Sequence, residues 1–166
     1  MNLQNFTFET FVFQVLNGLS TSMLLFLLAA GMTLIFGLME VVNLAHGTYY
    51  LLGAYFGYSV MNATNNFWLA LVIAPLGVGV VGFVMERFFL RPLYSKAHSN
   101  MVILTLGFAY LVGDLTTLIW GGDPKSIPAP APFDHSIELL GRSFPSYRLF
   151  VAGLGLLLAL GLWLLL

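Results

Sequence analysis

The first long apolar segment, residues 10–39, reads TFVFQVLNGLSTSMLLFLLAAGMTLIFGLM and contains no Asp, Glu, Lys or Arg. A helix needs about 20 predominantly apolar residues to cross a hydrocarbon core roughly 30 Å thick. An uncharged segment of this length therefore predicts a helix that spans a membrane.

The next uncharged segment is longer and lies between Glu40 and Glu86, apart from a histidine that is neutral at ordinary pH. As a single helix it would be about 67 Å long, at about 1.5 Å per residue. That is roughly twice the ~30 Å of a hydrocarbon core, so we expect two spans. The polar cluster from Asn62 to Asn66 supplies the turn between them.

Applied to the whole chain, the same criterion predicts spans at 14–38, 45–62, 67–88, 101–120 and 149–166. Backbone groups in hydrocarbon must be satisfied within their own segment, and apolar runs without period-2 alternation indicate helices rather than barrel strands. The predicted fold class is all-α, a polytopic transmembrane bundle of about five helices in contact with membrane lipid.

The amino-acid composition also indicates a membrane protein, and it excludes other classes of protein. Hydrophobic residues make up 59% of the 166 residues and charged residues only 8%, whereas a soluble domain is roughly 25% charged. A net charge of −1 argues against a nucleic-acid partner, which requires a basic surface. There is no cysteine, and the three histidines are far apart, so we predict no disulfide, no metal site and no cofactor.

Positive charges give the orientation. The short connector 86–100 contains Arg87, Arg91 and Lys96, so we place it in the cytoplasm. The amino terminus and the loop 121–147 then lie outside. Because that loop contains five prolines, we expect it to be extended and stiff rather than helical.

A polar cluster from Glu40 to Tyr50 interrupts the first two spans with almost no loop. Broken helices in transporters form substrate sites, because free N–H groups at the start of a half-helix attract carboxylates. The alternative is a tight cytoplasmic turn whose Asn43 and His46 only cap helix ends. Residues alone leave both interpretations open.

Two further features are candidates. Asp114 is a carboxylate deep within an apolar run, and such acids mark pathways or ion pairs, although a structural hydrogen bond explains it equally well. Glycines allow helices to approach closely in lipid, where there is little hydrophobic drive for association. We predict helix packing at the glycines Gly53, Gly57, Gly77 and Gly82.

The sequence also resembles a known family. Residues 34–47, LIFGLMEVVNLAHG, and residues 50–55, YLLGAY, are similar to the signature of the branched-chain amino acid ABC permeases. Shorter similar segments follow in the same order, at Glu86-Arg87, Arg91-Pro92-Leu93, Thr105-Leu106-Gly107 and Trp120-Gly121.

This resemblance implies a permease subunit that moves leucine, isoleucine or valine across the bacterial inner membrane and is not itself an enzyme. It implies separate ATP-binding subunits, a second related permease and a periplasmic substrate-binding protein as partners. Candidate pathway or gate residues are Asn43, His46, Thr48 and Tyr49, with Asp114 as a further candidate.

Alternatives remain at this point. Urea and short-chain amide permeases share the signature, and a non-transporting membrane protein or an intramembrane enzyme using His46 and Asp114 belongs to another class. Family members continue for several more spans, so residues 1–166 correspond to the amino-terminal part of one permease domain. We therefore expect an incomplete permease that does not by itself couple ATP hydrolysis to transport.

Overall fold

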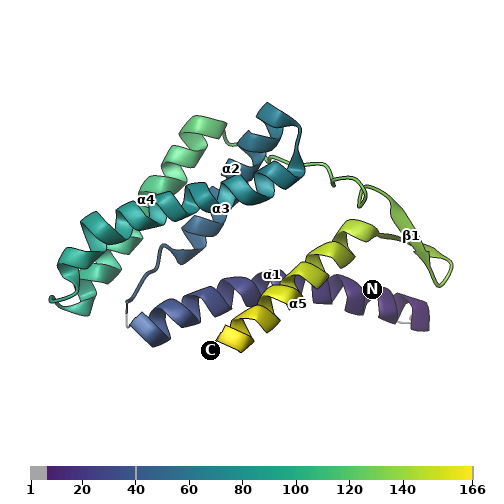
Figure 1. Cartoon of the computed structure of the whole chain (residues 1–166), viewed down its shortest axis with the longest axis horizontal. Coiled ribbons are helices and arrows are strands. Elements are labelled where there is room, and N and C mark those ends of the chain that lie inside the picture. Colours follow the sequence, from purple (N-terminus) through teal and green to yellow (C-terminus); the bar gives the residue numbers. More distant parts are fainter. Residues whose placement is uncertain (1–6, 40, 166) are drawn as a thin grey trace. The chain divides into compact units, whose positions relative to one another are not determined.

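A computed structural model of the chain describes residues 7–39 and 41–165 (Figure 1). Its helices and strands occur in the following order: α1 (Phe8–Met39), α2 (His46–Thr64), α3 (Phe67–Val84), α4 (His98–Trp120), β1 (Ser136–Leu139), β2 (Arg142–Pro145) and α5 (Ser146–Leu165). Each helix falls at a segment that the charge-free runs predict, although α1 begins earlier than expected.

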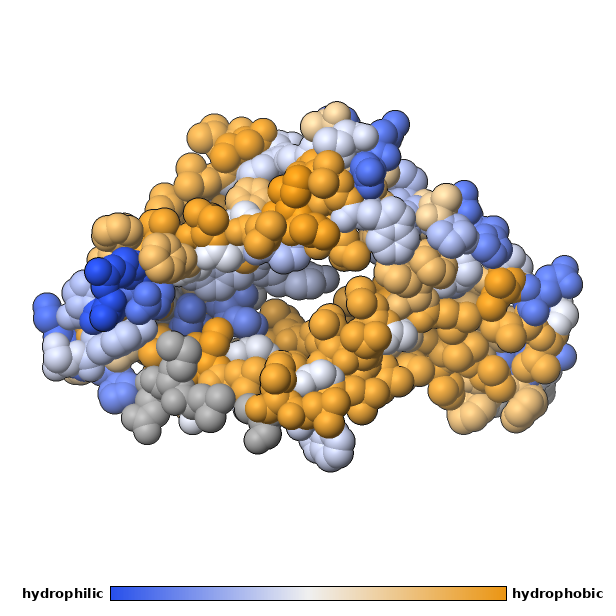
Figure 2. Space-filling model, viewed as in Figure 1, coloured by the Kyte–Doolittle hydropathy of each residue, from blue (hydrophilic) through white to orange (hydrophobic). Residues whose placement is uncertain are grey.

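The predicted fold class is confirmed: the chain is a helical, polytopic membrane protein. Within the described residues, four helices are long and apolar enough to cross a membrane, namely α1, α3 with its extension to Leu93, α4 and α5. Large apolar side chains cover much of the face in Figure 2. The 19-residue α2 is not among the four because it carries more polar residues, so its crossing of the membrane stays a prediction.

The chain divides into two compact units, 31–127 and a second unit of 1–30 with 128–166. In the first unit, α2 and α3 form a hairpin at the predicted polar turn. Asn65 adopts a left-handed conformation (φ 54°) and donates its N–H to the Met61 carbonyl at 2.8 Å. Asn66 then caps α3, because its side chain accepts the Leu69 N–H at 3.1 Å.

Small residues line the contact between α2 and α3. A Cβ added at Gly53 would lie 3.7 Å from Val78, and one added at Gly57 would lie 3.8 Å from Ala74. At Gly77 the added atom would lie only 2.9 Å from the ring of Phe56. Gly82, in contrast, has no atom within 4 Å of such a Cβ.

The helical segment that was predicted to end at residue 88 continues beyond that position. A π-helical turn, η2 (Met85–Leu90), and a 3₁₀ turn, η3 (Arg91–Leu93), continue it. Pro92 lies in the first turn of η3, where a proline is tolerated because an N–H at that position would have no helical partner. The connector to α4 is therefore only residues 94–97.

The core of this unit joins the end of α1 to α3 and α4. Its buried members are Val41, Met85, Leu90 and Met101. Half-buried side chains pack around them, namely Ile35, Tyr49, Leu93, Leu104 and Phe108. The segment between α1 and α2 is thus fixed against the cytoplasmic-side turns η2 and η3 in our predicted orientation.

In the second unit the first part of α1 packs with α5 and the hairpin. The Ser20 hydroxyl donates to the Arg148 carbonyl at 2.8 Å, and the Arg148 guanidinium donates to Asn17 Oδ1. The hairpin turns at Leu140 and Gly141, both with positive φ, as the two-residue turns that match strand twist require. The sequence predicted an extended loop here, and its pairing into a hairpin was not foreseen.

Packing between α1 and α5 depends on Gly155. A Cβ at this position would lie 2.7 Å from Met23 Cβ, closer than real Cβ contacts allow. We predict that Gly155→Ala lowers stability by about 1–3 kcal/mol, the usual cost of overpacking. The measurement is thermal unfolding in detergent.

The matched control is Gly153→Ala, which adds the same methyl group to the same helix where no atom lies within 4 Å. It should be neutral or slightly stabilising, because alanine favours helix by up to ~1 kcal/mol over glycine. Equal unfolding temperatures for the two variants would contradict this packing.

Candidate functional site

The helix break predicted at the polar cluster is present. α1 ends at Met39 and α2 begins at His46. Asn43 forms a local turn, since its Oδ1 accepts the Ala45 N–H at 3.0 Å. Ala45 then caps α2 through its carbonyl, which accepts the Thr48 N–H at 2.9 Å. The Asn43 side chain thus stabilises the turn before α2, whereas the capping residue of α2 is Ala45.

A residue of α4 completes the hydrogen bonding of the break. The Thr105 side chain accepts the Leu44 N–H at 3.1 Å and donates to the Met101 carbonyl at 2.8 Å. Thr105 is fully buried, with 0% exposure. A backbone group without a partner in such an apolar setting would cost several kcal/mol, roughly 2–7 by transfer measurements. Thr105 therefore fixes the non-helical segment to α4.

His46 lies against a glycine of α1. A Cβ at Gly31 would lie 3.0 Å from both Cε1 and Nε2 of the His46 ring. The missing side chain at Gly31 therefore provides the space that the imidazole occupies. The last turns of α1 and the first turn of α2 thus meet at this ring.

Two cavities border the break. The larger has a volume of about 320 Å³ and is lined by Ile35, Val41, Asn43, His46, Tyr49, Val78, Gly82, Glu86, Leu90 and Tyr94. The smaller, of about 160 Å³, shares Ile35, Val41, Asn43 and His46 with it and is closed by Met32, Phe36, Val42 and Leu44. Asn43 and His46 therefore line both cavities.

The walls of the larger cavity are mostly apolar, with a carboxylate on one side. The Tyr94 hydroxyl donates to Glu86 Oε1 at 3.3 Å. Partial burial and the negative charge of Glu86 raise the pKa of Tyr94, so its hydroxyl stays protonated at neutral pH and remains a donor. The cavity thus combines an aliphatic surface with one carboxylate.

The predicted site residues are only partly gathered together. Asn43, His46 and Tyr49 line the larger cavity. Thr48 lies in the same first turn of α2 but is not a lining residue. Asp114 is exposed on α4 and lies outside both cavities.

Glu86 and Tyr94 are lining residues that the sequence analysis did not select. Glu86 closes the second charge-free run, which is the one signal that could have drawn attention to it. Within the part of the chain that the structure describes, no three His, Asp or Glu side chains are grouped as metal ligands.

Comparison with known proteins identifies the family. Residues 14–166 match the family described as branched-chain amino acid transport system / permease component. The chain belongs to this family. The predicted resemblance is thus confirmed over nearly the whole sequence.

Individual relatives of this permease family are more distant. The high-affinity branched-chain amino acid transport system permease protein LivH of Salmonella typhimurium, and that of Escherichia coli, are each 24% identical over 131 residues. BraD of Pseudomonas aeruginosa is 24% identical over 128 residues. The alignments cover 74%, 74% and 72% of this chain but only 42% of each relative. No solved structure matches.

Loss of the Thr105 hydroxyl tests how the break is held. Thr105→Val would leave the Leu44 N–H without its acceptor, so we predict a loss of about 1–3 kcal/mol in stability. Thr105→Ser keeps the hydroxyl and should lose clearly less. The measurement is thermal unfolding of the purified variants in one detergent.

The control is Thr117→Val, because the exposed Thr117 hydroxyl donates only to the Gly113 carbonyl of its own helix. This variant should stay within about 0.5 kcal/mol of the parent, as surface substitutions usually do. A Thr105→Val protein as stable as Thr117→Val would refute the role of Thr105.

Proposed function

We propose that this chain forms part of the permease subunit of an ABC importer that moves branched-chain amino acids across the bacterial inner membrane. The observation that carries the proposal is the apolar cavity at the helix break, in a chain that belongs to this permease family. The related LivH and BraD proteins are named as permeases for these amino acids.

The cavity suits an aliphatic amino acid in three respects. Ile35, Val78 and Leu90 offer an apolar surface to a branched side chain. Glu86 offers a carboxylate to the ammonium group. The N-terminus of α2, which begins at His46, favours a carboxylate through its N–H groups and dipole. Urea has neither an apolar side chain nor a charge, so this lining favours an amino acid.

Gating follows from the position of the break. Asn43 and His46 line both cavities, and Tyr49 lines the larger one from the first turn of α2, beside Thr48. A shift of α2 against α1 would move these side chains as a group, and this movement would connect or separate the two cavities. Asp114 lies on α4 and lines neither cavity, so we do not include it among the proposed gate residues.

The remaining components of the importer would be separate proteins. We propose ATP-binding subunits in the cytoplasm, a second related permease and a periplasmic substrate-binding protein. The family match supports these partners in general terms. The basic connector 86–100 supports a cytoplasmic position for the end of α3, with the amino terminus and the loop 121–147 outside.

His46→Leu in the intact importer tests the pathway. The variant replaces the imidazole between the two cavities with a side chain that cannot hydrogen-bond. Loss of one such polar contact costs roughly 1–3 kcal/mol, so we predict uptake of labelled leucine at least about fivefold below the parental rate. Insertion is checked by quantifying the subunit in the membrane.

His98→Leu makes the same replacement at an exposed position that begins α4, and it should transport at close to the parental rate. Parental uptake by a normally inserted His46→Leu protein would refute the pathway role. Uptake of urea in preference to leucine by the intact system would refute the substrate.

A further inference from the structure

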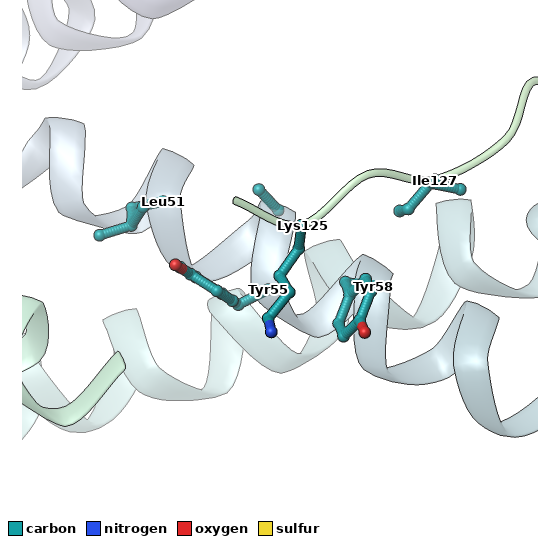
Figure 3. Close-up of a pocket in the computed structure, with 6 residues that line it drawn as sticks. Leu51, Tyr55, Tyr58, Lys125 and Ile127 are labelled. Atoms are coloured by element: carbon teal, nitrogen blue, oxygen red, sulfur yellow. The ribbon is translucent and has the colours of Figure 1, made fainter. Parts of the chain in front are cut away.

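α2 lines another cavity, separate from those at the break. It has a volume of about 350 Å³ and is lined by Leu51, Ala54, Tyr55, Tyr58, Lys125 and Ile127 (Figure 3). The first four residues belong to α2, and the last two belong to the segment that follows α4. In Figure 3 the Lys125 side chain reaches down from this segment, with its ammonium group between Tyr55 and Tyr58.

Trp120 holds this segment over α2. Its indole N–H donates to the Ser59 hydroxyl at 2.7 Å, and its ring centroid lies 4.9 Å from that of Tyr55. Gly121 then turns the chain with a φ of 82°, a conformation that glycine adopts without strain. The segment that carries Lys125 is therefore fixed to α2 at Trp120, by one hydrogen bond and one ring contact.

The positive charge in this cavity is not balanced by the protein. No acidic residue lines it, and among the described residues Lys125 has no ion pair or hydrogen bond. Asp123, the acid closest in sequence, is exposed and does not line the cavity. The remaining lining consists of two tyrosines, which offer hydroxyl donors, and the aliphatic residues Leu51, Ala54 and Ile127.

We propose that this cavity binds the carboxylate of a small branched aliphatic acid through Lys125, with its apolar part against Leu51 and Ile127. Resting on the proposed function, the ligand is the transported amino acid, and the cavity lies at the outer end of its route. The ammonium group has no acidic partner in the lining. A carboxylate would receive a charge-assisted hydrogen bond from it, whereas a neutral amide or urea would not.

A lipid phosphate is the other anion that a lysine near an aromatic residue can attract at a membrane surface. The cavity has a volume of about 350 Å³, which is small for a phospholipid with two acyl chains. A compact ligand fits this arrangement better. We therefore assign the site to a soluble carboxylate.

The test compares two ligands of nearly the same shape, isovalerate and isovaleramide, which differ in charge. The purified chain is placed in nanodiscs of phosphatidylcholine, and binding is followed by saturation-transfer-difference NMR. A charge-assisted hydrogen bond contributes about 1.5–3 kcal/mol, so isovalerate should bind at least about tenfold more tightly. Lys125→Gln should abolish that preference.

Two variants are controls. Lys125→Arg keeps the positive charge and should keep the preference. Lys96→Gln removes a lysine from the connector before α4 and should leave the preference unchanged. Equal binding of the two ligands by the parent, or a preference that survives Lys125→Gln, would overturn the inference.

The lipid alternative has its own outcome. Binding of phosphatidylglycerol that depends on Lys125, without any binding of isovalerate, would assign the site to lipid and overturn the inference. Uptake by the intact importer is a separate readout. If leucine uptake still depends on His46 while the carboxylate preference is absent, only the site at Lys125 fails.

Discussion

The hydrogen bond between the Leu44 backbone and the Thr105 side chain is the contact on which the site depends. A helix that begins in an apolar environment leaves N–H groups at and just before its first turn that must find partners. Asn43 satisfies one of them locally, and Thr105 satisfies another from α4, more than sixty positions later by the numbering. Because the break is fixed in this way, Asn43 stays outside both helices, His46 begins α2, and both line the two cavities.

The composition of α2 is explained by what surrounds it. One face carries Gly53 and Gly57, which allow close packing against α3. Four of its polar or aromatic side chains line cavities: His46 and Tyr49 at the break, and Tyr55 and Tyr58 in the cavity of Lys125. Such side chains contribute to the low hydrophobicity of α2 relative to the other helices.

Much of the fold is predictable from charge alone. The uncharged runs gave the five helices, and the polar residues around Asn65 and at Asn43 gave the turn and the break. These features are local, so a single sequence carries them. The hairpin at Leu140-Gly141 was missed because its turn lacks the usual Asn-Gly or Asp-Gly pair.

The candidate site was predicted less completely. Thr105 attracted notice only as part of a family motif, and Glu86, Tyr94 and Lys125 were not selected as site residues. Their roles depend on neighbours that are distant in sequence, such as Glu86 beside the break and Lys125 over Tyr58. No periodicity or spacing encodes such a pairing. Asp114 shows the opposite case, a prominent residue in the sequence that lies outside the cavities.

The central claim is that the break lines a cavity that is open to water inside the membrane protein. Because the chain has no cysteine, single cysteines report on this without background. Val78 lines the cavity, whereas Val80, two residues further along α3, is 63% exposed on the outer surface of this helix pair. The decisive measurement is the rate at which a charged, water-soluble maleimide modifies Val78→Cys and Val80→Cys in native membranes. Thiols react as hydrated thiolates, so the account predicts modification at least about tenfold faster at position 78, slowed by leucine. Equal rates, or an unreactive position 78, would contradict it.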